Sequence, residues 1–171
     1  MKTWAAPVDD AAYADRAARP GMSTVAQLPN GKYIMTYEYG GAPGRAGFPT
    51  YYRIADDPRQ FASAAQHLLS AGGTVPTSSP YVVWSPVGGE QGTLIVSGYS
   101  HSQLFVNRAL GAEGKWEMFT VGEPGAYTRH LRVLKGDPNR LLIMGAGKLP
   151  PSTTNVVTMT IVDLKKTMRL R

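Results

Sequence analysis

The sequence predicts an all-β protein made of about three four-stranded antiparallel blades, and three observations support this. The 19 glycines and 13 prolines, with only 18% charged residues, suit many short strands joined by tight turns. Short runs of alternating apolar and polar residues recur between the turns. The same order of strands and turns appears three times, which is typical of β-propeller repeats rather than of helical solenoids.

The first repeat unit begins at Arg19 and contains three predicted strands. Residues 24–28 alternate in polarity, residues 29–31 (Pro-Asn-Gly) form a turn, and residues 33–37 continue as the second strand. Residues 50–54 are the third strand. The order of features indicates a meandering antiparallel sheet.

The second and third units repeat this order from Ser78 and Ala126. The spacing of roughly 50 to 60 residues matches propeller blades of three or four short strands. The predicted strands are 81–84, 93–97 and 103–107 in the second unit, and 130–134, 141–144 and 156–160 in the third.

A competing helical pattern follows the third strand of the first unit. Asp57 and Pro58 are typical of a helix start, and apolar residues from Phe61 to Leu69 follow at helical spacing before Gly72. Because strand signals flank this segment, we expect an insertion or a helix of one to three turns on the outside of the first blade.

One partial domain is expected to account for all 171 residues, a length at which a chain with 43% hydrophobic residues can bury a core. We divide it into residues 1–18 (outer strand of a preceding blade), 19–77, 78–125 and 126–164 (three blades) and 165–171 (basic tail).

The net charge of +6 and pI near 9.7 would ordinarily indicate an anionic partner. However, Lys165, Lys166, Arg169 and Arg171 lie in the last seven positions, and without these four residues the charge falls from +6 to +2. We therefore interpret the basic character as a solvated C-terminal end and expect no nucleic-acid partner.

Cysteine is absent from the sequence, which excludes disulfides, thiolate metal sites and a cysteine nucleophile. No segment among the first thirty residues has the order of a signal peptide, and no window reaches the apolar length of a membrane span. We expect a soluble chain without an export signal or membrane partner, and its location stays open.

Incomplete copies of an Asp-box motif lie near the expected outer strands. In sialidase-type propellers this motif, Ser-x-Asp-x-Gly-x-Thr-Trp, marks the turn between the third and fourth strands of a blade. Thr3 and Trp4 match its last two positions, Asp56 and Phe61 match the acid and the aromatic residue of a second copy, and Trp116 matches the end of a third. The chain therefore resembles a sialidase-like propeller.

A closer likeness runs in order along nearly the whole chain. The segments that carry it are Arg19-Pro20-Gly21-Met22, Pro29-Asn30-Gly31-Lys32-Tyr33, Tyr37-Glu38-Tyr39-Gly40-Gly41, Ser78-Ser79-Pro80-Tyr81-Val82-Val83-Trp84-Ser85-Pro86, Ala126-Tyr127-Thr128-Arg129 and Leu141-Leu142-Ile143-Met144-Gly145-Ala146-Gly147. Together they resemble the exo-arabinanases of glycoside hydrolase family 93. These are usually secreted enzymes with a six-bladed sialidase-like propeller that cut the ends of α-1,5-linked arabinan. The resemblance implies that this chain is the C-terminal half of such a propeller.

Glu38 is the candidate catalytic residue. It follows a predicted strand between Tyr37 and Tyr39, before two glycines that allow a sharp turn. The resemblance implies that it belongs to a catalytic carboxylate pair, because retaining glycoside hydrolysis requires both an acid/base and a nucleophile. The partner carboxylate would lie in the half that this sequence lacks, and either role stays open for Glu38. An ordinary strand-end carboxylate facing water is the alternative.

Candidate substrate-binding residues are Arg19, Tyr39, Tyr81, Tyr127 and Arg129. Arginine can bind hydroxyl or carboxylate groups in a bidentate manner, and tyrosine offers a flat hydrogen-bonding surface to a sugar ring. A structural ion pair for the arginines and core packing for the tyrosines are the alternatives. Recurrence at the start of each unit favours a shared binding face.

Metal and cofactor sites are not expected. His67, His101 and His130 have no metal-ligand spacing, and the turn Gly145–Gly147 precedes prolines that prevent a phosphate-binding helix. The chemistry of glycoside hydrolysis also requires no cofactor.

Three functions follow from these patterns. The first is an exo-arabinanase-like retaining hydrolase that is incomplete as a catalyst by itself, acts on arabinan or a related plant cell-wall oligosaccharide, and is completed by more of its own protein or by a second copy. The second is a non-catalytic propeller fragment that binds carbohydrate or protein. A sialidase-related hydrolase is a weaker alternative, because it would need an arginine triad and only Arg19 and Arg129 are candidates.

Overall fold

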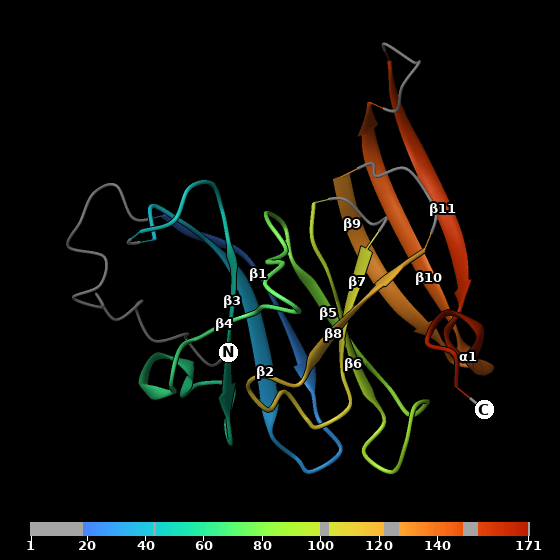
Figure 1. Cartoon of the computed structure of the whole chain (residues 1–171), viewed down its shortest axis with the longest axis horizontal. Helices are drawn as coiled ribbons and strands as arrows, with labels where there is room; N and C mark the ends of the chain where they lie inside the picture. The colour runs from blue at the N-terminus through green and yellow to red at the C-terminus, as the bar shows by residue number, and fades with distance from the viewer. Residues whose placement is uncertain (1–18, 43, 100–102, 122–126, 149–153, 171) are drawn as a thin grey trace, which may run out of the picture.

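The computed structural model describes residues 19–42, 44–99, 103–121, 127–148 and 154–170. Three antiparallel sheets follow one another along the chain, each built from strands that are consecutive in sequence (Figure 1). The predicted outer strand at 1–18 lies outside the described residues.

The first sheet contains β1 (Arg19–Gln27), β2 (Tyr33–Gly40), β3 (Thr50–Ala55) and β4 (His67–Leu68), in that spatial order. The turn at Gly31, whose φ is 84°, allows β1 to reverse into β2. The predicted strands at 24–28, 33–37 and 50–54 are thus confirmed.

The second sheet has the same order: β5 (Tyr81–Ser85), β6 (Thr93–Ser97), β7 (Gln103–Asn107) and β8 (Trp116–Thr120). Every residue of β6 is buried, as expected for a strand in the middle of a sheet that is covered on both faces. Here the predicted and observed strands agree closely.

The third sheet contains β9 (Tyr127–Leu134), β10 (Asp137–Lys148) and β11 (Asn155–Asp163), so its described part has three strands rather than the expected four. The turn predicted at 136–139 is shorter, because β10 already begins at Asp137. The short helix α1 (Leu164–Thr167) follows β11, and the Asp163 carboxylate caps it by accepting the amide of Lys166.

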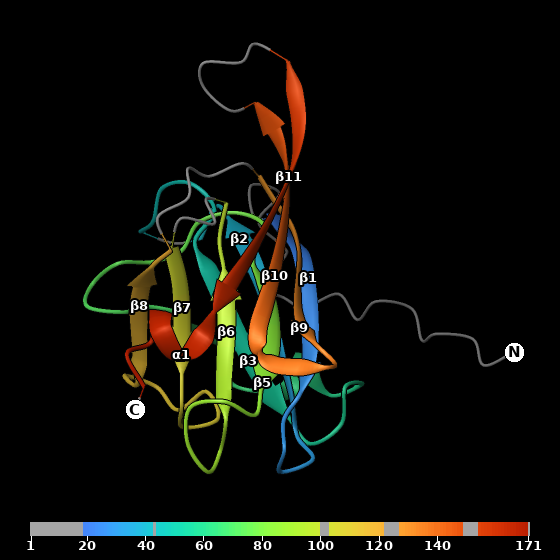
Figure 2. The same cartoon turned by 90° about the vertical axis from the view of Figure 1, so that its right-hand side faces the viewer.

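The first strands of the three sheets lie next to each other: β1 contacts β5, and β5 contacts β9. Figure 2 places these three strands toward one side of the molecule and the outer strand β8 toward the other. Blades whose first strands gather at a common axis define a β-propeller. The all-β, propeller-fragment prediction is therefore confirmed.

Two hydrophobic cores join neighbouring sheets. Between the first and second sheets, Ile34 and Tyr52 pack with Leu94 and Phe105, all at most 2% exposed. Between the second and third sheets lie the buried residues Ile95, Leu104, Val106, Leu131, Leu141, Ile143, Val162, Leu164 and Met168. Each fully buried aliphatic side chain contributes about 1.5–3 kcal/mol. These two cores therefore fix how each sheet stacks on the next.

The segment with the helical pattern forms one turn of 3-10 helix, η2 (Phe61–Ser63), and then returns as β4. This is the short end of the expected range. Arg53 explains why the segment does not continue as a helix, because its guanidinium Nη1 donates to the carbonyls of Phe61, Ala62 and Ala64 and holds them against β3.

The turn after β3 is held by a different acid from the one that the Asp-box match identified. Asp57 Oδ1 accepts the backbone amide of Arg59 at 2.8 Å, and Asp57 also forms an ion pair with the Arg59 side chain. Asp56 instead points outward to Lys32, at 3.1 Å. In the second sheet Asn107 has the turn-holding role before Trp116, and its Oδ1 accepts the amides of Ala109 and Gly111.

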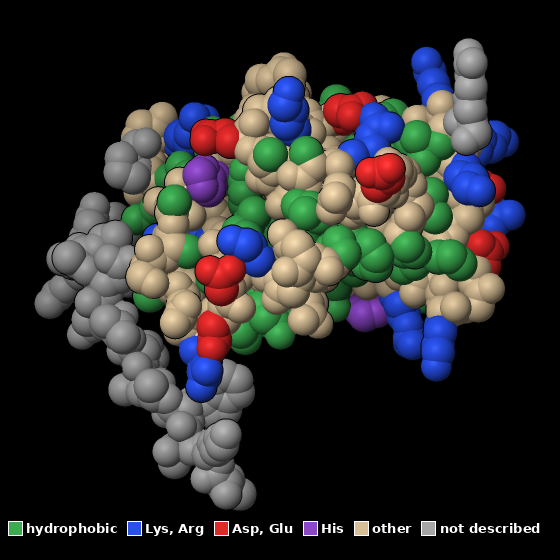
Figure 3. Space-filling view, turned by 90° about the horizontal axis from the view of Figure 1, so that it is seen from below, with side chains coloured by type: hydrophobic (Ala, Val, Ile, Leu, Met, Phe, Trp, Pro, Cys, Tyr) green, Lys and Arg blue, Asp and Glu red, His purple; other side chains and the backbone are tan. Residues whose placement is uncertain are grey.

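The surface carries its basic side chains mainly at one end. Seen from below, Lys and Arg side chains gather at the right-hand end, where the third sheet lies (Figure 3). The exposed residues there include Arg132, Lys135, Lys165, Lys166 and Arg169. Leu164 and Met168, on either side of Lys165 and Lys166 in the sequence, are buried. The end of the described chain therefore packs onto the third sheet while its charges face solvent.

Within the described segments, no helix has the length and apolarity needed to cross a membrane. The same segments contain no cluster of three or more His, Asp or Glu residues arranged to hold a metal ion.

Candidate functional site

Glu38 lies near the end of β2 and is 2% exposed. It is the only buried Asp or Glu among the residues that the structure describes. Its Oε2 atom accepts the backbone amide of Ser79 at 2.8 Å and the hydroxyl of Ser78 at 3.0 Å. A carboxylate from the first sheet is thus held by the segment that enters the second sheet.

Ser78 and Ser79 adopt left-handed backbone conformations, with φ of 58° and 44°. Such values are uncommon for residues other than glycine and cost free energy that surrounding contacts must offset. Here the Ser78–Ser79 turn aims a hydroxyl and an amide at the same oxygen of Glu38. The strain is therefore located where the buried carboxylate needs donors.

Gly21, opposite Glu38 on β1, lies beside the other carboxylate oxygen. A β-carbon at Gly21 would lie 3.5 Å from Glu38 Oε1, which is ordinary contact distance. The β1–β2 register shifts between Gly21 and Thr24, and Met22 in this bulge has a φ of 51°. Bulges of this kind redirect side chains at functional edges. As a result, Met22 is 43% exposed beside the site.

Tyr39 is 8% exposed and belongs to an aromatic cluster on the first sheet. Its ring meets Tyr51 edge-on at 5.7 Å, and Tyr51 stacks with Tyr37 at 6.2 Å. Tyr37 Oη in turn accepts from Gln66 and Arg53. This packing makes the cluster rigid, and a sugar-binding role for Tyr39 stays a prediction.

Tyr81 begins β5 and reaches across to the third sheet. Its Oη and the Nδ1 of His130 on β9 are 2.9 Å apart, and the two rings meet edge-on at 5.2 Å. Either atom can donate, depending on the histidine tautomer. The sequence favoured a surface or hydrogen-bonded role for His130 over a ligand role, and the structure shows that it is hydrogen-bonded.

For Arg19, Tyr127 and Arg129 we describe only the position of the backbone. Arg19 begins β1, and Tyr127 begins β9 just as Tyr81 begins β5. Arg129 falls at a register shift, between Thr128 opposite Gly145 and His130 opposite Met144. Arg19, Tyr81 and Tyr127 are thus the first residues of β1, β5 and β9, whereas Arg129 lies two residues farther along β9, and a shared binding face stays a prediction.

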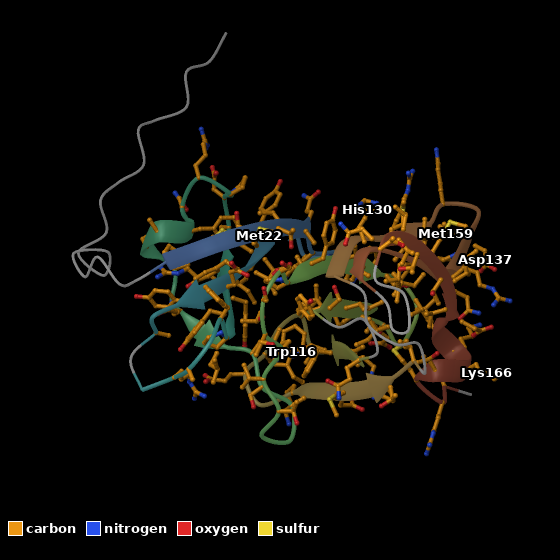
Figure 4. The ribbon with its side chains drawn as sticks, turned by 90° about the horizontal axis from the view of Figure 1, so that it is seen from above. Met22, Trp116, His130, Asp137, Met159 and Lys166 are labelled. Carbon is orange, nitrogen blue, oxygen red and sulfur yellow. The ribbon has the colours of Figure 1, made fainter. Side chains whose placement is uncertain are left out.

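Two of the candidates, Glu38 and Tyr81, make contacts that reach from one sheet toward the next. Glu38 contacts the Ser78–Ser79 turn, Tyr81 lies two residues beyond that turn, and its hydroxyl contacts His130, next to Arg129. Figure 4 shows Met22 and His130 along the same upper margin, with Trp116 of the outer strand β8 below it. Arg19, Tyr81, Tyr127 and Arg129 thus lie on the inner strands β1, β5 and β9, whereas Glu38 and Tyr39 lie on the adjacent strand β2.

Ser78, Ser79 and His130 were not among the predicted site residues. Ser78 and Ser79 did belong to a segment that resembles the exo-arabinanases, but their left-handed conformation had no sequence signal. His130 gave no signal beyond its position near Arg129.

Comparison with solved structures identified close relatives. The α-L-arabinofuranosidase of Fusarium graminearum from GH93, in complex with arabinobiose, is 48% identical with a TM-score of 0.85, over 91% of this chain and 45% of its own. A mutant of the Fusarium enzyme with a glutamate replaced by alanine, in complex with an iminosugar inhibitor, is 47% identical with the same TM-score and coverage. The α-L-arabinanase of Penicillium chrysogenum, also in complex with arabinobiose, is 46% identical with a TM-score of 0.79, over 88% of this chain and 43% of its own.

The chain spans less than half of the length of these relatives. No family model matches the sequence. No curated protein matches it.

Proposed function

From the premise that the chain belongs to the GH93 family of α-L-arabinofuranosidases and arabinanases, we propose that it acts on the ends of arabinan chains, as an exo-α-1,5-L-arabinanase-like retaining hydrolase. The observation that carries this proposal is the buried Glu38, held by two donors, within a chain 46–48% identical to arabinan-degrading relatives. Two of these relatives bind arabinobiose.

Glu38 is proposed to be one of the two catalytic carboxylates. Two hydrogen bonds to Oε2, from the Ser78 hydroxyl and the Ser79 amide, orient the carboxylate. Retaining hydrolysis needs a second carboxylate at about 5–5.5 Å. Because Glu38 is the only buried Asp or Glu in the described part of the chain, we propose that the second comes from elsewhere.

The substrate-binding face is proposed to follow the starts of the inner strands. Tyr81 offers a hydroxyl in contact with His130, Arg19 and Tyr127 begin the neighbouring strands β1 and β9, and Arg129 lies two residues beyond Tyr127 on β9. Tyr39 supports this face from its aromatic cluster. Aromatic rings and hydroxyls suit the apolar faces and hydroxyl edges of arabinofuranose units.

The working protein is proposed to be a complete propeller, with residues 19–77, 78–125 and 126–164 as three of its blades. The remaining blades would come from more of the same protein or from a second copy that closes a six-bladed ring. Stacking between sheet faces would join the two halves of such a ring. No cofactor or metal is part of this proposal.

A non-catalytic binding module is the second candidate function. It is favoured because the described residues include a single buried carboxylate, that of Glu38, together with the tyrosine-bearing face. Such a module would bind arabino-oligosaccharides without cleaving them.

Incubation of the protein with linear arabino-oligosaccharides separates the two candidates. We expect the completed propeller to release arabinobiose-sized products. Glu38→Gln should lower turnover by at least about 10³-fold. Glu117→Gln, a matched change at an exposed glutamate of β8, should leave turnover unchanged. Sugar binding that persists in Glu38→Gln without turnover in either protein would support the binding module. Turnover that survives Glu38→Gln would refute the catalytic assignment.

A further inference from the structure

Tyr99 follows the end of β6 and is 49% exposed. It is the one strongly exposed aromatic side chain among the residues that the structure describes. A single exposed apolar side chain is common on protein surfaces and by itself indicates no function. The place of Tyr99 in the fold, beside the residues that hold Glu38, is what gives it a role.

The exposure of Tyr99 belongs to the end of the second sheet and not to an uncovered face. The sheet has a neighbour on each side, since β5 contacts both β1 and β9. On β6, Val96 packs into the core shared with the first sheet and Ile95 into the core shared with the third. All of β6 and Gly98 are buried, and exposure begins at Tyr99. Both faces of the sheet are therefore covered up to the point where Tyr99 leaves it.

Tyr99 lies at the same end of the sheets as Glu38. Its amide donates to the carbonyl of Thr77 at 2.7 Å. The next two residues along that segment, Ser78 and Ser79, donate to Oε2 of Glu38. Hydrogen-bonded segments in a sheet lie about 4.8 Å apart. One short segment therefore separates the backbone of Tyr99 from the carboxylate of Glu38.

The backbone around Tyr99 is fixed on both sides of this segment. On one side, the amide of Thr50 donates to the carbonyl of Pro76 at 2.9 Å. On the other side, Gly98 packs so closely that an added β-carbon would lie 3.1 Å from both the Pro76 Cβ and the Thr77 carbonyl oxygen. The ring of Tyr99 is thus presented from a backbone with little freedom to move.

Tyr81 and Tyr99 lie on the same side of the second sheet. Tyr81 is paired with Ser97, the last residue of β6. Side chains two positions apart in an extended segment point to the same side, so Tyr99 follows Ser97. The β-carbon position of Gly98, between them, faces Pro76 on the side of the first sheet. Tyr81 and Tyr99 are therefore diagonal neighbours, which are about 7–8 Å apart and within reach of aromatic side chains.

We propose that Tyr99 is a further substrate-binding residue, whose ring stacks against an arabinofuranose unit next to the unit held at Glu38. This role rests on the proposed function at the ends of arabinan chains. A tyrosine ring can cover the apolar face of a sugar while its hydroxyl bonds to the hydroxyls of the sugar. Because the backbone of Tyr99 is already fixed, this contact costs little conformational entropy. Tyr99 thereby extends the binding face beyond the reacting unit.

Isothermal titration calorimetry of the full chain with arabinotriose tests this role. We expect Tyr99→Ala to raise the dissociation constant about tenfold. Tyr99→Phe keeps the ring and should stay within about threefold of the unmodified chain. Tyr33→Ala is the matched control, because Tyr33 is a partly buried tyrosine that begins β2, at the end opposite Glu38, and it should leave the dissociation constant unchanged.

Turnover of arabinotriose by the completed propeller supplies the second readout. A residue that binds the substrate equally in the ground state and the transition state changes KM and leaves kcat. We therefore expect Tyr99→Ala to raise KM about tenfold and to keep kcat within about twofold. The melting temperature should stay within about 2 °C of that of the unmodified chain, because the side chain is exposed.

The outcomes separate this role from the proposed function. Tyr99→Ala that binds arabinotriose as tightly as the unmodified chain would overturn the role of Tyr99 and leave the proposed function standing. A loss of affinity in Tyr33→Ala equal to that in Tyr99→Ala would also overturn it. Binding that depends on Tyr99 without turnover would support the role and contradict the catalytic assignment. An unmodified chain that does not bind arabinotriose would overturn both.

Discussion

The hydroxyl of Thr24 joins the first sheet to the second close to the candidate site, and its removal gives a sharp test of the structure. Thr24 Oγ1 accepts the backbone amide of Val82 at 3.0 Å and lies 3.0 Å from Thr36 Oγ1. It also donates to the carbonyl of Pro80 at 3.3 Å. Val82 is 2% exposed and Thr36 is fully buried, so water cannot replace these bonds.

The substitution Thr24→Val keeps the shape of the side chain and removes the hydroxyl. The buried amide of Val82 is then left without its acceptor, which costs about 1–3 kcal/mol, and the bond to Thr36 is also lost. We expect the free energy of unfolding to fall by about 2 kcal/mol. For a chain of this size each 1 kcal/mol lowers the melting temperature by about 2–4 °C, so the expected shift is about 4–8 °C.

Thermal unfolding followed by circular dichroism measures this shift, with Thr24→Ser as the matched control that keeps the hydroxyl. Hydrogen exchange at the Val82 amide should accelerate in Thr24→Val and stay slow in Thr24→Ser. The reasoning would be refuted if Thr24→Val melted within about 1 °C of the unmodified chain, or if Thr24→Ser lost as much stability as the valine variant.

Two further predictions concern the turns that close the first and second sheets. Asn107→Ala should lower the free energy of unfolding by about 2–4 kcal/mol, because the buried Asn107 Oδ1 accepts the amides of Ala109 and Gly111. Asn107→Asp keeps an oxygen acceptor and should lose less stability. Urea unfolding measures both variants. Hydrogen bonds from Arg59 lower the pKa of Asp57 to about 2. The stabilisation by the Asp57 carboxylate is therefore complete above its ordinary pKa of about 3.8 and is lost as the pH falls through about 2. Between about pH 5 and pH 2, Asp57→Asn should therefore lose less stability than the unmodified chain, as measured by urea titrations.

Most strands of the first two sheets could be predicted from the sequence because local signals suffice for them. The turn at Gly31 and the alternation on either side determine β1 and β2 without reference to distant residues. The sequence predicted a short helix or insertion after β3 but not that it would stop after one 3-10 turn, because this depends on Arg53, which binds three of its carbonyls. Tertiary contacts of this kind commonly outweigh helix propensity.

The candidate site was predictable only in part. Glu38 could be selected because its neighbours resemble a known family, but its hydrogen bonds come from Ser78 and Ser79, about forty positions away. No local pattern indicates that two consecutive serines adopt left-handed conformations. The contact between Tyr81 and His130 is likewise set by how the second and third sheets stack, which depends on the whole core between them.

Two hydrogen bonds from Ser78 and Ser79 orient the carboxylate of Glu38, and this bears on how the proposed two-carboxylate site would form. Ser78 and Ser79 belong to the segment that leads from the first sheet into the second, and Gly21 lies beside the carboxylate on β1. The core shared by the two sheets and the Thr24 hydrogen bonds hold these sheets together. A second carboxylate therefore does not have to organise Glu38, and needs only to reach about 5–5.5 Å from it. Pre-organisation of this kind lowers the cost of completing the site, because the binding of the missing part has only its own side chains to order. Under the proposal that Glu38 is one of two catalytic carboxylates, the described part of the chain already orients that one.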